Sequence, residues 1–158
     1  MQIAVVGTGY VGLVTGVCLA EVGHTVLCVD TNEEKIRKLR AGTPPIYEPG
    51  LEGLLRRNAE HERLSFTTDL SQALAGAEAV FIAVGTPQGE DGSADLQYVK
   101  AVARDVGRLA DRDMLVIVKS TVPVGTCDAV EAVVTAELKQ RGGPTLKLTV
   151  ASNPEFLK

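Results

Sequence analysis

The sequence predicts an α/β fold, in which helices cover both faces of a doubly wound, mainly parallel, six-stranded sheet. Two observations carry this expectation. Short apolar runs typical of buried strands alternate with segments of helical periodicity along the 158 residues. A Gly-x-Gly-x-x-Gly pattern also follows the first apolar run directly, where a strand would turn into a helix. The expected order of the strands in the sheet is 3-2-1-4-5-6.

The composition is that of one globular domain spanning residues 1–158. A hydrophobic share of 45% suffices for a sizeable core, and a net charge of -4 leaves no basic footprint for nucleic acid. Residues 3–20 carry no charge, but glycines interrupt them, so we expect no membrane span and no membrane partner. Because no targeting segment is recognisable, a cytoplasmic protein is expected.

The first unit is a strand at residues 3–6, the motif Gly7-Thr8-Gly9-Tyr10-Val11-Gly12 and a helix to about residue 22. Gly7 would permit a tight turn, Gly9 would let the backbone approach a pyrophosphate, and Gly12 would let helix and strand pack closely. Backbone N–H groups and the positive end of the helix would face the phosphates. The residues expected to bind the cofactor here are Gly7, Gly9, Tyr10, Val11 and Gly12.

The second unit ends in an acid. A strand at residues 25–29 runs into Asp30, and residues 31–34 form a capping box for a helix that reaches about residue 40. Asp30 follows Gly12 at close to the roughly 20 residues expected for an acid that binds the adenosine ribose. Together the two units predict a Rossmann-type dinucleotide site, although the acid spacing also permits a flavin or a methyl donor.

Lys35 lies one helical turn after this acid, where a cation could meet the adenosine side of the cofactor. A cation at that place raises the question of NADP. Asp30 would repel a 2′-phosphate, however, and the residue that follows it is Thr31 rather than arginine. The cofactor predicted by these residues is therefore NAD.

The remaining elements follow in the same alternation. A proline-rich insertion at residues 43–50 precedes a short amphipathic helix that carries Leu51, Leu54 and Leu55. Further strands are expected at residues 64–67, 79–84, 114–118 and 146–150, and helices at about 69–75, from Asp95 onward and after Gly125. The strands at 64–67 and 146–150 alternate apolar and polar residues, which is typical of sheet edges with one wet face.

The three cysteines have no metal-ligand spacing, so no metal site is predicted. Cys18 and Cys28 lie in apolar segments and are expected in the core. Cys127 would lie in the first turn of the helix after Gly125, where a helix dipole lowers a thiol pKa. No histidine or other base is suggested beside it, so we expect a structural role.

Polar residues follow the strands at the carboxyl edge of the sheet, where parallel sheets bind their ligands. Hydroxyls at Thr86 and Thr121 could bind a ribose or a reacting hydroxyl, and Glu155 could take or relay a proton. The residues alone leave open that Thr121 only shapes a turn and that Glu155 is an exposed end residue. The segments in question are Val84-Gly85-Thr86-Pro87, Ser120-Thr121 and Asn153-Pro154-Glu155-Phe156-Leu157.

Five motifs, in order along the chain, resemble the N-terminal domain of the UDP-glucose/GDP-mannose dehydrogenase family, in its UDP-glucose branch. They are residues 7–12, 45–51, 84–87, 120–126 and 153–157. The resemblance covers essentially the whole chain and implies an NAD-dependent oxidation of UDP-glucose to UDP-glucuronate with two NAD. In that family the sugar C6 alcohol becomes an aldehyde, a cysteine captures it, a second hydride transfer gives a thioester, and water releases the acid.

The same resemblance implies roles for individual residues. Asp30 and Lys35 would hold the adenosine ribose, Thr121 would support proton handling through water, and Glu155 would assist the thioester stage. Phe156 and Leu157 would lie with Glu155 in the substrate region. The residues implied to line the dinucleotide site are Val84, Gly85, Thr86, Pro87, Ser120 and Thr121.

The family's nucleophilic cysteine belongs to a later domain, and none of Cys18, Cys28 and Cys127 matches it. We therefore expect an isolated cofactor domain of a longer enzyme that is homo-oligomeric, and no turnover by these 158 residues alone. Two alternatives stay open. One is a dehydrogenase that acts on GDP-mannose or UDP-N-acetylmannosamine, and the other is a noncatalytic NAD-binding module.

Overall fold

The sheet has six parallel strands in the order β3-β2-β1-β4-β5-β6, which confirms the predicted topology. The computed structural model describes residues 1–89 and 92–154. The strands are β1 (Gln2–Val6), β2 (Thr25–Val29), β3 (Leu64–Thr67), β4 (Ala79–Ile82), β5 (Met114–Val118) and β6 (Leu148–Ser152). The helices are α1 (Tyr10–Glu21), α2 (Glu33–Arg40), α3 (Leu51–Glu60), α4 (Leu70–Leu74), α5 (Gln97–Leu109) and α6 (Thr126–Arg141).

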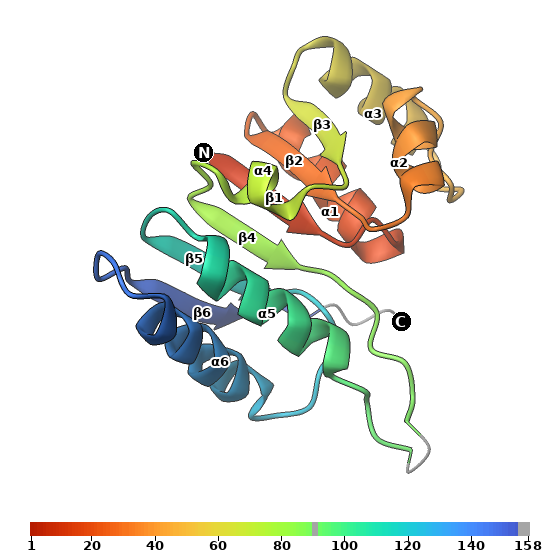
Figure 1. Cartoon of the computed structure of the whole chain (residues 1–158). Helices are drawn as coiled ribbons and strands as arrows, with labels where there is room; N and C mark the ends of the chain where they lie inside the picture. Colours follow the sequence, from red (N-terminus) through yellow and green to blue (C-terminus); the bar gives the residue numbers. More distant parts are fainter. Residues whose placement is uncertain (90–91, 155–158) are drawn as a thin grey trace.

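Helices cover both faces of the sheet (Figure 1). On one face α1, α2 and α3 bury side chains such as Leu13 and Leu55 against the strands. On the other face α4, α5 and α6 do the same with side chains such as Val99 and Val130. The central strands β1 and β4 are therefore buried on both faces, as their continuous apolar sequences predict. Among the described residues, no helix is long and apolar enough to cross a membrane.

Three strands have different bounds from those predicted, and β1 differs only because it begins one residue earlier, at Gln2. β4 ends at Ile82 rather than at residue 84, because the Ile82 carbonyl accepts N–H groups from both Lys119 and Ser120, at 2.8 and 3.0 Å. This shared acceptor marks the end of regular pairing with β5. β6 begins two residues later than predicted, because its pairing with β5 starts where Leu148 meets Met114.

Two expectations about burial were wrong. Cys18 is exposed, because the buried stripe of α1 runs through Leu13, Gly16, Val17 and Ala20 and Cys18 falls outside it. Cys28, in contrast, is fully buried as expected, and burial raises the pKa of its thiol to about 12.

Thr67 is the second wrong expectation, since only Ser65 lies on an exposed face of β3. Thr67 is 3% exposed. Its hydroxyl donates to Gln72 Oε1 at 2.7 Å and accepts the Asp69 N–H at 3.0 Å. The polar side chain therefore shapes the turn from β3 into α4 rather than facing solvent.

Helices α5 and α6 make a close contact at Gly107. A Cβ atom at this position would lie 2.9 Å from the backbone oxygen of Val134 and 2.7 Å from Glu137 Cβ. Backbone atoms of a packed helix cannot move aside easily. The contact is flanked by a hydrogen bond of 2.9 Å from Arg108 Nε to Glu137 Oε2. The pairing of α5 with α6 therefore requires a glycine here.

Gly107→Ala is expected to lower the free energy of unfolding by about 1–3 kcal/mol, because overpacking outweighs the gain in helix propensity. Gly53 in α3 is the matched control, since nothing lies within 4 Å of a Cβ built there. Gly53→Ala is expected to raise the same quantity by up to about 1 kcal/mol. Urea denaturation followed by circular dichroism measures both changes. A change of the free energy of unfolding with the same sign in both variants would contradict the conclusion that the α5–α6 contact requires a glycine at position 107.

Candidate functional site

A crevice of about 500 Å³ opens at the carboxyl ends of β1, β2 and β4. The strand order reverses between β1 and β4, and open α/β sheets bind ligands at this switch point. The glycine motif, the end of β2 and the segment after β4 form its walls, and residues of α5 line one side. Residues that line it include Gly7, Gly9, Asp30, Lys35, Thr68, Leu70, Val84, Gly85, Tyr98 and Val102.

The three motif glycines meet different constraints. Gly7 has a φ of +100°, and a Cβ there would lie 2.5 Å from the Ala83 carbonyl oxygen. A Cβ at Gly12 would collide with the carbonyl oxygen of Gly7. These contacts confirm the expected tight turn and close helix packing. At Gly9 no protein atom lies within 4 Å of a built Cβ, so the backbone there is open to the crevice, as a pyrophosphate would require.

Helix α1 begins at Tyr10, immediately after this open backbone. Its first turn contains no acidic residue, so no side chain of that turn offsets the positive end of the helix dipole. Tyr10 is exposed and its hydroxyl donates to a carboxylate oxygen of Glu48. The insertion that contains Glu48 is therefore tied to the start of α1, a link that neither motif predicts from its own residues. Val11, the next residue, is partly buried.

Asp30 lies at the end of β2 with most of its carboxylate engaged. Its Oδ2 atom accepts the Thr8 N–H at 3.0 Å, the Thr8 hydroxyl at 2.7 Å and the Lys35 ammonium at 2.7 Å. Its Oδ1 atom accepts the Asn32 N–H at 3.0 Å. The structure thus brings together the acid and the cation that the sequence singled out.

The charge of Asp30 is set by two opposing effects. Partial burial on its own would raise the pKa of the carboxyl. Hydrogen bonds from Lys35, Thr8 and the Asn32 N–H outweigh burial, so the pKa lies below its ordinary value. Asp30 is therefore a fixed anion at neutral pH, and the ion pair with Lys35 is only partly exposed.

The start of α2 explains why Lys35 lies here. The N-cap is Asn32, whose side chain accepts the Lys35 N–H at 2.9 Å, and not Thr31 as the capping box predicted. The Asn32 N–H is taken by Asp30, so the chain turns sharply between the acid and the helix. This turn directs the Lys35 side chain back to Asp30, five residues earlier.

Thr8 is the residue that sequence reasoning missed. It is 0% exposed, and its hydroxyl and N–H both donate to Asp30. The sequence contains one clue to this contact. Thr8 follows β1 and Asp30 follows β2, and because these strands pair in parallel, both residues lie at the same edge of the sheet. The apolar wall formed by Leu70, Tyr98 and Val102 was missed as well, since no motif identifies these residues.

The segments after β4 and β5 are linked by hydroxyl groups. Ser120 Oγ donates to the Val84 carbonyl oxygen at 2.6 Å, and Thr86 Oγ1 donates to the Thr121 carbonyl oxygen at 3.0 Å. Ser120 is buried and Thr121 is exposed, while Thr86 is partly buried. The two segments therefore lie side by side at the carboxyl ends of β4 and β5, and of the two only the segment after β4 is among the described residues that line the crevice. Gly85 lines the crevice and Pro87 is exposed next to it.

The last predicted motif is described only in part. Asn153 continues from β6, and its N–H donates to the Val118 carbonyl oxygen at 3.0 Å. Glu155, Phe156 and Leu157 lie outside the described residues. Within residues 1–89 and 92–154, no group of three His, Cys, Asp or Glu side chains could hold a metal ion.

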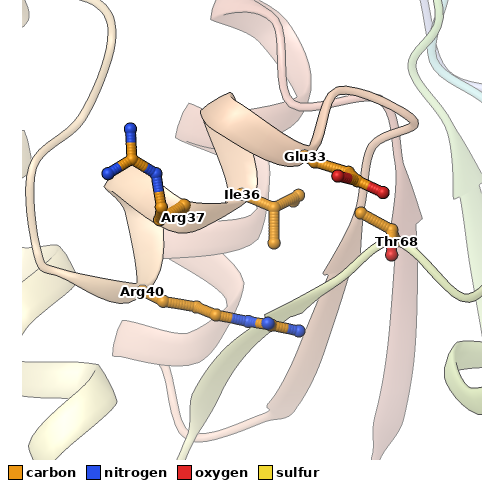
Figure 2. A pocket seen from close by; sticks show the side chains of 5 residues that line it. All are labelled: Glu33, Ile36, Arg37, Arg40 and Thr68. Atoms are coloured by element: carbon orange, nitrogen blue, oxygen red, sulfur yellow. The ribbon is translucent and has the colours of Figure 1, made fainter.

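A second, smaller hollow of about 370 Å³ adjoins the crevice beside α2, and Thr68 lines both. Its other lining residues are Glu33, Ile36, Arg37 and Arg40. Arg37 and Arg40 extend in different directions (Figure 2), and Arg40 Nε donates to the Phe66 carbonyl oxygen at 2.9 Å. The two guanidinium groups therefore do not converge as a phosphate site would need.

Comparison with known proteins places this geometry in one family. The model of the UDP-glucose/GDP-mannose dehydrogenase family, NAD binding domain, matches residues 1–158. A UDP-glucose 6-dehydrogenase from Pseudomonas aeruginosa is 52% identical over all of this chain, which spans 35% of that relative.

Solved structures agree in fold as well as sequence. A UDP-glucose dehydrogenase from the archaeon Pyrobaculum islandicum is 49% identical with a TM-score of 0.90, over 99% of this chain and 36% of that one. A GDP-mannose dehydrogenase from Pseudomonas aeruginosa, solved as a ternary complex, is 40% identical with a TM-score of 0.88, over 100% of this chain and 37% of that one. The chain belongs to the UDP-glucose/GDP-mannose dehydrogenase family and corresponds to its NAD-binding domain.

Proposed function

We propose that this domain holds the adenosine half of NAD at Asp30 and Lys35 and serves an enzyme that oxidises UDP-glucose to UDP-glucuronate with two NAD. The observation that carries the proposal is the Asp30–Lys35 pair, which lines the same crevice as Gly7 and Gly9 and adjoins the glycine motif through Thr8. The family match supports NAD as the cofactor. The chain spans about a third of its relatives, so the reaction is proposed for a longer protein.

The pair offers an acceptor and donors to a ribose diol. An ionised carboxylate has about four lone-pair sites, and three of the four donors seen here converge on Oδ2. Oδ1, with a single donor, keeps capacity for a ribose hydroxyl. An ammonium has three N–H donors, and Asp30 takes one from Lys35. Both groups can therefore engage the adenosine ribose without giving up their own contact.

The rest of the crevice suits the remaining parts of the cofactor. The open backbone at Gly9 and the first turn of α1, with Tyr10 and Val11, would face the diphosphate. Leu70 and Val102 supply apolar surface for the adenine ring. NAD, when bound, supplies the hydride acceptor for the oxidation. The segments that carry Thr86, Pro87, Ser120 and Thr121 would line the nicotinamide side.

The roles proposed for the last segments follow the family resemblance. Thr121, exposed at the end of β5, would support proton handling beside the reacting alcohol. Glu155 would assist hydrolysis of a thioester, with Phe156 and Leu157 in the substrate region. The thioester would form on a cysteine outside this chain, because Cys28 is buried, Cys18 lies on the outer side of α1 and Cys127 is partly buried against the core.

The choice of UDP-glucose rests on graded similarity. Proteins named for UDP-glucose are 43–52% identical to this chain, whereas the neighbour named for GDP-mannose is 40% identical and one named for UDP-N-acetylmannosamine is 32% identical. GDP-mannose and UDP-N-acetylmannosamine therefore stand as the second candidates. A noncatalytic NAD-binding module is not favoured by any particular contact in the structure.

The domain is expected to bind NAD at least about tenfold more tightly than NADP, because a 2′-phosphate would meet the anionic Asp30 carboxylate. Asp30→Asn is expected to weaken NAD about tenfold or more and to narrow the preference over NADP. Isothermal titration calorimetry with both cofactors measures the two effects. Glu34→Gln is the matched control, since it removes one negative charge from the adjoining helix α2, where Glu34 forms an ion pair with Lys38 and not with Lys35. Tighter binding of NADP by the unaltered chain would overturn the cofactor assignment.

The affinity for NAD is expected to stay constant from about pH 8 down to about pH 5. The pKa of Asp30 is lowered, so the carboxylate loses its charge only as the pH falls through a value below the ordinary one of about 3.9. Calorimetric titrations at intervals of one pH unit measure the profile. A loss of affinity that begins near pH 6 would mean that another group controls binding.

Mixing the 158-residue chain with UDP-glucose and NAD is expected to give no steady production of NADH, because the captured aldehyde needs a cysteine that these residues do not supply. Absorbance at the NADH band measures the rate. The full-length relative from Pseudomonas aeruginosa serves as the positive control. Steady NADH production by this chain alone would refute the proposal that the reaction needs a cysteine from outside these residues.

A further inference from the structure

We infer that Thr8 is a positioning residue that locks the Asp30 carboxylate in the orientation that reads the ribose and thereby sets the preference for NAD over NADP. The inference rests on the proposed function, because it assigns Asp30 to the adenosine ribose. Thr8 lies inside the glycine motif, but binding of a phosphate by this motif does not require a threonine at position 8. The motif itself demands glycine only at positions 7, 9 and 12.

The contact is a pair of donors from one residue to one atom. Thr8 N–H and Thr8 Oγ1 both donate to Asp30 Oδ2, at 3.0 and 2.7 Å. Because one donor comes from the backbone and the other from the side chain, they approach the oxygen from fixed directions. A carboxylate held by such a pair cannot rotate about its Cβ–Cγ bond without losing both hydrogen bonds. Thr8 therefore fixes the plane in which the carboxylate lies.

Burial gives this contact its strength. Thr8 is fully buried and the Asp30 side chain is 12% exposed, so water cannot readily replace the lost donor. A hydrogen bond to a charged group contributes more than one between neutral groups, and a buried acceptor left without its donor keeps the desolvation cost. The Thr8 hydroxyl is thus the internal partner of Asp30, and Lys35 is the partner on the crevice side.

The consequence for the cofactor follows from the other oxygen. With Oδ2 taken by Thr8 and Lys35, Oδ1 is the atom left with acceptor capacity. A 2′-hydroxyl can donate to it, whereas a 2′-phosphate is mostly doubly ionised at neutral pH and carries negative charge, like the carboxylate. If the carboxylate could rotate, its negative charge would repel a 2′-phosphate less effectively, and the discrimination against NADP would fall. Thr8 hence supports selectivity as well as affinity.

The test compares Thr8→Val with Thr8→Ser in the 158-residue chain. Valine keeps the branched shape and the backbone N–H but removes the hydroxyl donor, and serine keeps the hydroxyl. Thr8→Val is expected to weaken NAD by about tenfold and NADP by much less, while Thr8→Ser stays within about threefold of the unaltered chain. Calorimetry gives the affinities, and circular dichroism checks the fold. Thr8→Ala replaces Thr8→Val if the latter does not fold.

A double-mutant cycle separates positioning from a general structural role. In an Asp30→Asn background, Thr8→Val is expected to have little further effect on NAD affinity, because the residue acts through the carboxylate. An equal loss in both backgrounds, or no loss in either, would overturn the inference. Failure of the unaltered chain to bind NAD would instead overturn the proposed function. NAD binding that is insensitive to Thr8→Val would leave that function standing and reject only the role of Thr8.

Discussion

The structure depends on how closely helix α1 can approach strand β1. Gly7 turns the chain at a positive φ and Gly12 lies against its carbonyl oxygen, so the helix starts directly above the end of the strand. That approach places the positive end of α1 at the switch point of the sheet. It also places Thr8 beneath the end of β2. Without these two glycines, the glycine motif could not form its wall of the crevice, and Thr8 could not reach Asp30.

Much of the fold follows from the sequence because its signals are local and agree with one another. Continuous apolar runs identified the central strands, and alternation placed β3 and β6 at the edges. Strand ends were less predictable, since β4 stops where Ile82 accepts two N–H groups from the chain after β5. Such a limit is set by a tertiary contact. Cys18 was misplaced for a similar reason, because in a helix that is apolar nearly all round, composition does not identify the buried stripe.

The site was predictable where a motif supplies the chemistry and not where contacts do. The glycine motif and Asp30 could be read from spacing, and Lys35 from its place one turn later. The role of Thr8 depends on a hydrogen bond across 22 residues, and the apolar wall that includes Val102 depends on how α5 crosses the sheet. Neither leaves a periodic trace in the sequence. Side-chain contacts between distant elements are therefore the part of the site that the sequence predicts least.

The paired hydroxyl contacts between the segments after β4 and β5 have a consequence for comparing relatives. Ser120 binds the backbone of one segment, and Thr86 binds the backbone of the other, so each segment holds its neighbour. They behave as one module assembled from two distant stretches of sequence. Chimeras within the family would have to exchange both stretches together. Swapping one alone would leave a backbone carbonyl oxygen of one segment without its side-chain donor.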